Sequence, residues 1–232
     1  MKNPMPIRRR HLLRNASLGG LALLGGLRPA LALSESDAAS GVRAALERGA
    51  DAALASLGRR DGFLGNPLVR IELPGALRDG AKLIRGMGQG QRLDELITAM
   101  NRAAEAAMPE ARHLLVQTVR NISVDDALRI VRGGDDAVTR FFETKTRAPL
   151  TQKFLPIVTQ ATERQQLAEK YNAVAGRAAG FGLVRKEDAN LQGYVTERAL
   201  DGLYLMIGEE EKKIRQDPVG TGSAILKRVF GA

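Results

Sequence analysis

The fold class is decided by the stretch Gly133-Gly134-Asp135-Asp136-Ala137-Val138-Thr139-Arg140-Phe141-Phe142, which joins two predicted helices almost without a linker. A glycine pair is typical of the end of a helix. Asp135 is predicted to cap the next helix, and Asp136 to lie in its first turn, where a negative charge interacts favourably with the helix dipole. The pair Phe141-Phe142 is predicted to be on its buried side. Two helices that follow one another so closely indicate a compact helical domain.

Apolar residues recur at three- and four-residue spacing on both sides of this junction, a pattern that predicts further helices. The longest candidate covers about residues 191–215, and Asp217-Pro218 is predicted to stop it. Towards the N-terminus, Pro109 is predicted to open a helix and Ser123 to cap a short one. We therefore expect an all-α fold, a single compact domain of roughly eight to ten helices over residues 33–232.

One extended loop, near residues 59–74, is predicted to interrupt the helices. Asp61-Gly62 and Asn66-Pro67 are turn signals, and residues 69–73 alternate like a short strand for which the sequence offers no partner. Long ordered loops are often functional. The favoured interpretation is nevertheless a crossover that packs on the helices.

Residues 1–32 have the three parts of an export signal. A basic front contains Arg9-Arg10, followed by any residue, two leucines and a basic residue, which resembles a twin-arginine signal. The apolar middle is diluted by glycines and short for a membrane span, which needs about 20 apolar residues. Small residues at positions 30 and 32 predict cleavage after Ala32. We expect a periplasmic protein, exported by the twin-arginine route or by the general one.

Composition excludes several function classes. Six of the 35 basic residues and none of the 26 acidic ones lie in residues 1–32, so the formal charge falls from +9 to +3 without them. A nucleic-acid partner is therefore not expected. Cysteine is absent, which excludes disulfides, thiolate metal ligands and a cysteine nucleophile. Only His113 remains outside the leader, and this argues against zinc enzymes and haem proteins built on several histidines. No cofactor is expected.

Five motifs follow one another along the chain. They are Asp61-Gly62-Phe63-Leu64-Gly65-Asn66-Pro67, Met100-Asn101-Arg102-Ala103-Ala104-Glu105, the junction at 133–142, Lys153-Phe154-Leu155-Pro156-Ile157-Val158 and Glu209-Glu210-Glu211-Lys212-Lys213-Ile214-Arg215-Gln216-Asp217-Pro218. With these motifs the chain resembles a family of exported bacterial proteins known as a domain of unknown function, over roughly Ser36 to Gly231. The resemblance implies a helical periplasmic protein without an assigned activity, and it transfers no catalytic residue. Some similar proteins look like lipoproteins, but this chain lacks the cysteine that a lipid anchor requires.

Two function hypotheses remain open. The first is a non-enzymatic periplasmic binding or envelope-associated interaction protein, with a groove between helices for an apolar small molecule or a partner protein. The alternative is a divalent-metal site or a hydrolase-like enzyme built from carboxylates, although no metal-loop spacing is present. The candidates for ligand binding are Asp61, Asn66, Asp135, Asp136, Thr139, Phe142 and Glu210. An enzymatic activity is the less favoured of the two hypotheses, and no transmembrane anchor in the mature chain is expected.

Overall fold

The computed structural model describes residues 35–134, 136–163, 168–169, 171–172, 180 and 190–217. The chain divides into two units, residues 1–32 and residues 33–232, and every described residue belongs to the second. The predicted export signal, its cleavage site at Ala32 and the predicted cap Asp135 therefore lie outside the described residues.

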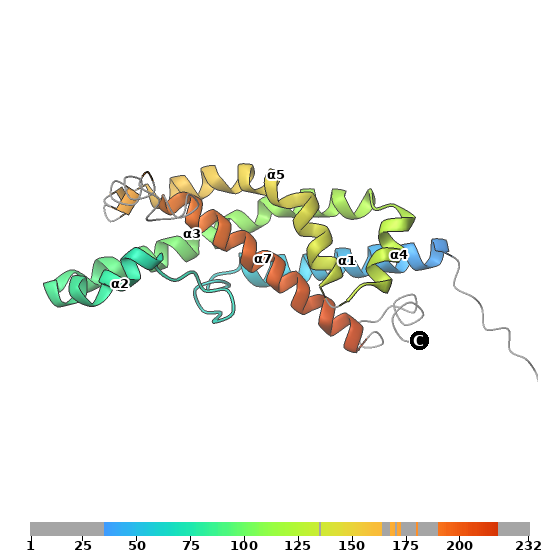
Figure 1. The fold of residues 1–232 in the computed structure, drawn as a ribbon, viewed down its shortest axis with the longest axis horizontal. Helices are drawn as coiled ribbons and strands as arrows, with labels where there is room; N and C mark the ends of the chain where they lie inside the picture. The colour runs from blue at the N-terminus through green and yellow to red at the C-terminus, as the bar shows by residue number, and fades with distance from the viewer. Residues whose placement is uncertain are drawn as a thin grey trace, which may run out of the picture. The chain divides into compact units, whose positions relative to one another are not determined.

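The described part of the chain is helical and contains no strand, which confirms the all-α prediction (Figure 1). Its elements are α1 (Glu35–Gly58), α2 (Gly75–Ile84), the π-helical segment η1 (Arg85–Gln89), α3 (Gly90–Arg120), α4 (Val124–Arg132), α5 (Ala137–Thr162) and α7 (Leu191–Gln216). These are six α-helices among the described residues, so the predicted eight to ten are too many.

Proline explains part of this error. Pro109 is predicted to open a new helix, but α3 continues through it from Gly90 to Arg120. A proline inside a helix removes one hydrogen bond and costs about 3 kcal/mol or more. The neighbouring side chains Met108 and Ala111 are completely buried, and their packing compensates for that loss. Two further prolines lie inside α5 for the same reason, so helix length here follows from packing rather than from local propensity.

The predicted helix ends are found around α4, but the start of α5 differs. Ser123 caps α4, because its hydroxyl accepts a hydrogen bond of 3.0 Å from the backbone N–H three residues on. Gly133 closes α4, as predicted. The residue that precedes α5 is Asp136, and its carboxylate makes no capping hydrogen bond. It pairs instead with Arg140 at 2.8 Å, so the first turn of α5 is stabilised by an ion pair.

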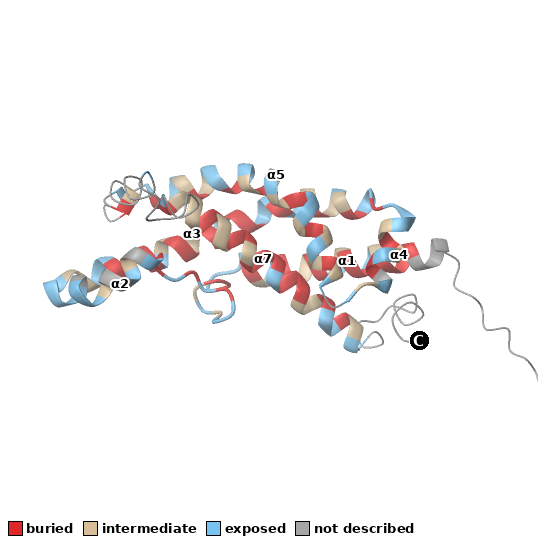
Figure 2. Cartoon of the chain, in the orientation of Figure 1, coloured by how far each residue is buried: buried red, intermediate tan, exposed pale blue. Residues whose placement is uncertain are grey.

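The core lies between the four long helices. Helix α3 contacts α1, α5 and α7, and α7 also contacts α1 and α5, while α4 covers α1 and α5. Figure 2 shows buried residues along these helices on the sides that face one another. Many of them are alanines, among them Ala53, Ala103, Ala104 and Ala107, all completely buried. Such small side chains let the helix backbones approach closely.

Candidate functional site

A buried carboxylate holds the loop of residues 59–74 on α3. Glu105 Oε1 accepts hydrogen bonds from the backbone N–H groups of Phe63 at 3.1 Å and Leu64 at 3.2 Å. Its other oxygen accepts one of 2.6 Å from Arg102. Only 6% of the Glu105 side chain is exposed, and a buried carboxylate is tolerated when its charge and its oxygens are paired in this way. Glu105 therefore anchors the loop while Arg102 balances its charge.

Asp61 and Asn66, both predicted site residues, shape this loop. Asp61 has a φ of 64°, the left-handed conformation, and its carboxylate accepts a hydrogen bond of 2.7 Å from Arg102. The hydrogen bonds that Arg102 donates, first to Glu105 and then to Asp61, raise the pKa of Arg102 above its ordinary value. Asn66 Oδ1 accepts from the backbone N–H of Leu68 at 3.1 Å, a turn typical of asparagine. The contacts of both residues are those of loop-forming residues.

Asn101 is a second anchor, and it explains the strand-like residues 69–73. Ile71 donates its N–H to Asn101 Oδ1 at 2.8 Å and accepts from Asn101 Nδ2 at 2.9 Å. The amide also donates to the carbonyl of Ile97. A side-chain amide thus supplies both hydrogen bonds that a neighbouring strand supplies in a sheet. This is why an extended segment is stable here without a pairing strand.

The other side of the loop lies on α7. A Cβ placed on Gly202 would lie 2.8 Å from Cε1 of Phe63 and 3.2 Å from Cβ of Val69, so the missing side chain makes room for the loop. Tyr194 also donates its hydroxyl to the carbonyl of Glu72 at 3.0 Å. The loop is therefore fixed between α3 and α7.

The remaining predicted site residues lie on α5 and α7, each with its own contacts. Asp136 pairs with Arg140, and Glu210 pairs with Lys213 at 2.6 Å. Thr139 packs closely on α7, because a Cβ on Gly208 would lie 2.7 Å from its hydroxyl oxygen. Phe142 is completely buried in the core.

The described acids of the metal hypothesis have separate partners. Asp61 pairs with an arginine of α3, Asp136 with an arginine of α5 and Glu210 with a lysine of α7. Within the part of the chain that the structure describes, no group of three or more His, Asp or Glu side chains is placed to hold a metal ion.

Three other carboxylates converge on Arg147 of α5. Its guanidinium lies 2.9 Å from Glu143, 2.7 Å from Glu197 and 2.7 Å from Asp201. Burial lowers the pKa of Arg147, but the hydrogen bond and charge of Asp201, with the charges of Glu143 and Glu197, more than offset this and raise it. The cation therefore bridges three carboxylates and offsets part of their charge, and it joins α5 to α7.

Tyr204 lies beneath this cluster. The Arg147 guanidinium stands 5.2 Å from the centre of the Tyr204 ring, within the range of a cation–π contact. Burial, above all, raises the pKa of Tyr204 to about 12. Its hydroxyl is thus neutral at physiological pH and shares a hydrogen bond of 2.9 Å with Thr146.

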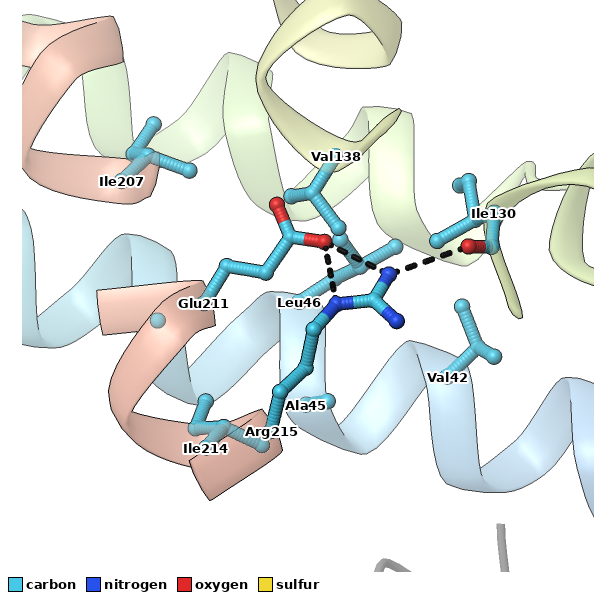
Figure 3. A pocket seen from close by; sticks show the side chains of 10 residues that line it. Val42, Ala45, Leu46, Ile130, Val138, Ile207, Glu211, Ile214 and Arg215 are labelled. Atoms are coloured by element: carbon cyan, nitrogen blue, oxygen red, sulfur yellow. Dashed lines mark hydrogen bonds and ion pairs between the residues drawn. The ribbon is translucent and has the colours of Figure 1, made fainter. Parts of the chain in front are cut away.

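An apolar hollow lies where α1, α4, α5 and α7 meet (Figure 3). Its lining residues are Val42, Ala45, Leu46, Gly49, Ile130, Val138, Ile207, Glu211, Ile214 and Arg215. The space between these side chains is about 340 Å³, a figure that includes open solvent. The centre of a water-sized sphere can occupy only about 20 Å³ of it, so it has room for about one water molecule.

An ion pair is the polar feature of this hollow. Arg215 donates to Glu211 Oε1 through Nε at 2.9 Å and through Nη2 at 2.7 Å, and also to the carbonyl of Ile130 at 3.1 Å. Figure 3 shows the pair among the apolar side chains of the wall. The hollow thus combines an apolar wall with a charged group that is already held in place.

Comparison with known proteins supplies the family. The model of a family described as "Protein of unknown function (DUF4197)" matches residues 32–231. This chain belongs to the DUF4197 family. No curated protein and no solved structure matches it significantly. The resemblance to a domain-of-unknown-function family is thereby confirmed.

Several interacting residues of this DUF4197 chain are not among the predicted site residues. Asn101 and Glu105, four residues apart, lie on the otherwise apolar face of α3 formed by Ile97, Ala104 and Met108. Polar residues at buried helical positions were the available signal, because such residues need partners. The Arg147 cluster joins residues about 50 positions apart, and no sequence pattern pairs them.

No helix in the described ranges is both long and apolar enough to cross a membrane.

Proposed function

We propose that this DUF4197 protein is a non-enzymatic periplasmic binding protein that holds the alkyl end of an amphipathic small molecule in the hollow between α1, α4, α5 and α7. The observation that carries the proposal is the lining: eight of its ten residues are apolar or glycine, and the other two form the Glu211–Arg215 pair. Sites for apolar ligands typically combine an apolar wall with a few placed polar groups.

The dimensions of the hollow limit what enters it. The hollow is wide enough for about one water molecule, so it accepts only the branched or terminal carbons of an alkyl chain. The remainder of the ligand lies in the part that opens to solvent. Small residues on α1, Ala45 and Gly49, leave this space free.

The alternative, a carboxylate metal site or a hydrolase-like enzyme, has no specific observation in its favour. The described candidate acids are paired with arginine or lysine, and those around Arg147 are held by its guanidinium. A catalytic acid or base has to be accessible to its substrate, and these ion pairs favour a structural role.

Filling the hollow tests the proposal. Ala45→Leu adds three carbons to the wall, and Ala44→Leu, at the exposed neighbouring position of α1, is the matched control. We expect the wild-type protein to bind the fluorescent probe N-phenyl-1-naphthylamine and to release it when dodecanoate is added. Ala45→Leu should weaken probe binding about tenfold, which corresponds to about 1.4 kcal/mol, while Ala44→Leu leaves it unchanged. Circular dichroism melts confirm that both variants are folded. A wild-type protein that binds no probe, or equal binding by both variants, contradicts the proposal.

Residues 1–32 direct export, by the twin-arginine route, and are removed after Ala32. The basic front, the apolar middle and the small residues at 30 and 32 support this, and the family match leaves residues 1–31 outside the matched region. Protein recovered from the periplasmic fraction is expected to have the intact mass of a chain that begins at Leu33. Lysines in place of Arg9 and Arg10 should keep the protein in the cytoplasm, because the twin-arginine route requires the arginine pair. A periplasmic protein that retains its first 32 residues contradicts cleavage, and export of the lysine variant contradicts the route.

A further inference from the structure

The hairpin between α2 and α3 exposes two large apolar side chains. Leu83 at the end of α2 is 70% exposed and Met87 in η1 is 69% exposed. They are four residues apart, the spacing that places side chains on one side of a helix. No residue of η1 is buried, and Figure 2 shows this end of α2 and η1 as exposed.

Glycine keeps the hairpin tip small. Gly88 has a φ of 76°, the conformation that allows the chain to turn from η1 into α3. A Cβ added at Gly86 or at Gly88 would meet no atom within 4 Å, so space is open around both positions. Leu83 and Met87 therefore stand at a narrow tip and not in a groove that encloses a peptide.

Basic side chains accompany the two apolar ones. Arg78, Lys82, Arg85 and Arg92 are all exposed. Residues 75–92 contain one acid, Asp79, so this segment has a formal charge of +3. On α3 the tip is followed by Asp94, which pairs with Arg85 at 2.6 Å, and by Glu95, which accepts a hydrogen bond from Gln91. Besides Arg85, the exposed cations of the segment are Arg78, Lys82 and Arg92, and none of them forms an ion pair with a side chain that the structure describes.

We infer that this tip docks on an anionic lipid surface, with Leu83 and Met87 entering the headgroup region and Arg78, Lys82 and Arg92 meeting the lipid phosphates. Exposed apolar side chains bordered by cations are the features of segments that lie in the membrane interface. A second copy of the chain fits less well, because two such tips would bring like charges together. Docking of this kind needs no membrane-spanning helix.

Vesicle flotation tests the inference. The chain Leu33–Ala232 is used, because these residues form a unit of their own and the basic, apolar leader would bind lipid by itself. Vesicles of phosphatidylcholine with phosphatidylglycerol are compared with vesicles of phosphatidylcholine alone, at low salt. We expect about fivefold more protein to float with the anionic vesicles, and the difference to shrink as salt screens the charges.

Two variants separate the apolar part from the charges. Leu83→Ser with Met87→Ser should reduce flotation with the anionic vesicles about fivefold, since the apolar side chains that enter the interface are lost. Lys82→Glu should reduce it as well. The matched control is Leu68→Ser, which removes an apolar side chain that is 62% exposed on another surface, in the loop of residues 59–74, and should change nothing.

Other outcomes would overturn the inference. Equal flotation of the wild-type chain with both kinds of vesicle, or undiminished flotation of the Leu83→Ser, Met87→Ser variant, rejects it. A third outcome also rejects it. If the wild-type protein binds no lipid and is a dimer in light scattering, and the Leu83→Ser, Met87→Ser variant is a monomer, then the tip is an interface between two copies of the chain. The inference does not rest on the hollow. Ala45→Leu is expected to float like the wild-type chain, so failure of either proposal is recognised separately.

Discussion

Replacing Glu105 by alanine is expected to lower the free energy of unfolding by about 3 kcal/mol or more. The substitution removes the acceptor of two backbone N–H groups, those of Phe63 and Leu64, and leaves the first of them in a buried position. It also removes the closer ion-pair partner of Arg102. Each buried donor without a partner costs about 1–3 kcal/mol, and the loss of the ion pair adds to that cost.

Two control substitutions show whether the charge or the hydrogen bonds matter more. Glu105→Gln keeps an oxygen for the two N–H groups but loses the charge that faces Arg102, and we expect about half of the loss caused by alanine. Glu110→Ala changes an exposed acid on the same helix and should stay within about 0.5 kcal/mol of the wild-type protein. Urea unfolding followed by circular dichroism measures all three. A Glu105→Ala variant as stable as Glu110→Ala would show that Glu105 does not hold the loop.

Gly62→Ala is expected to lower stability by about 3 kcal/mol, through a clash and not through a lost hydrogen bond. A Cβ at this position would lie 2.3 Å from the carbonyl oxygen of Leu57 and 2.5 Å from that of Ser56. Both are backbone atoms in the last turn of α1, so neither moves aside as the end of a side chain does. Relief requires the loop or the end of α1 to shift, and the loop is held by Glu105 and Asn101.

Gly75→Ala is the matched control for this clash. Gly75 begins α2, it is exposed, and an added Cβ would meet no atom within 4 Å. Alanine there should be neutral or stabilise the protein by up to about 1 kcal/mol, because it favours the helix. For a domain of this size 1 kcal/mol changes the melting temperature by about 2–4 °C, so Gly62→Ala should melt about 6–12 °C below the wild-type protein. Equal melting temperatures of the two variants would contradict the clash.

The all-α class was predictable because its signals are local. Three- and four-residue spacing of apolar residues, the cap at Ser123 and the glycine at 133 all act within one or two turns of helix. Whether a helix continues through a proline, by contrast, does not depend on local signals alone. Whether Pro109 ends a helix depends on how tightly Met108 and Ala111 pack against other helices, and the sequence gives no direct measure of that packing.

The residues of the candidate site likewise divide into those with a local sequence signal and those without one. Asp61 and Asn66 were recognised as turn residues from their neighbours in sequence. The anchors of the loop, Asn101 and Glu105, are 30 to 42 residues away from the loop atoms that they bind. The sequence offers no second strand for residues 69–73 and predicts that they lie on the helices, but their partner is a single amide side chain, which no strand pattern reveals. A polar residue on a buried helix face is the signal that would have pointed to it.

The attachment of one loop to two helices has a consequence for how this domain opens. Residues 59–74 are not helical, and a loop of this length usually exchanges its amide protons and is cut by proteases independently of the core. Here Glu105 and Asn101 hold it to α3, while Phe63 and Val69 fill the space beside Gly202 on α7. Freeing the loop therefore uncovers the faces of both α3 and α7 that it packs on. We therefore expect the loop to open together with the helices, as part of one cooperative unit, and not alone.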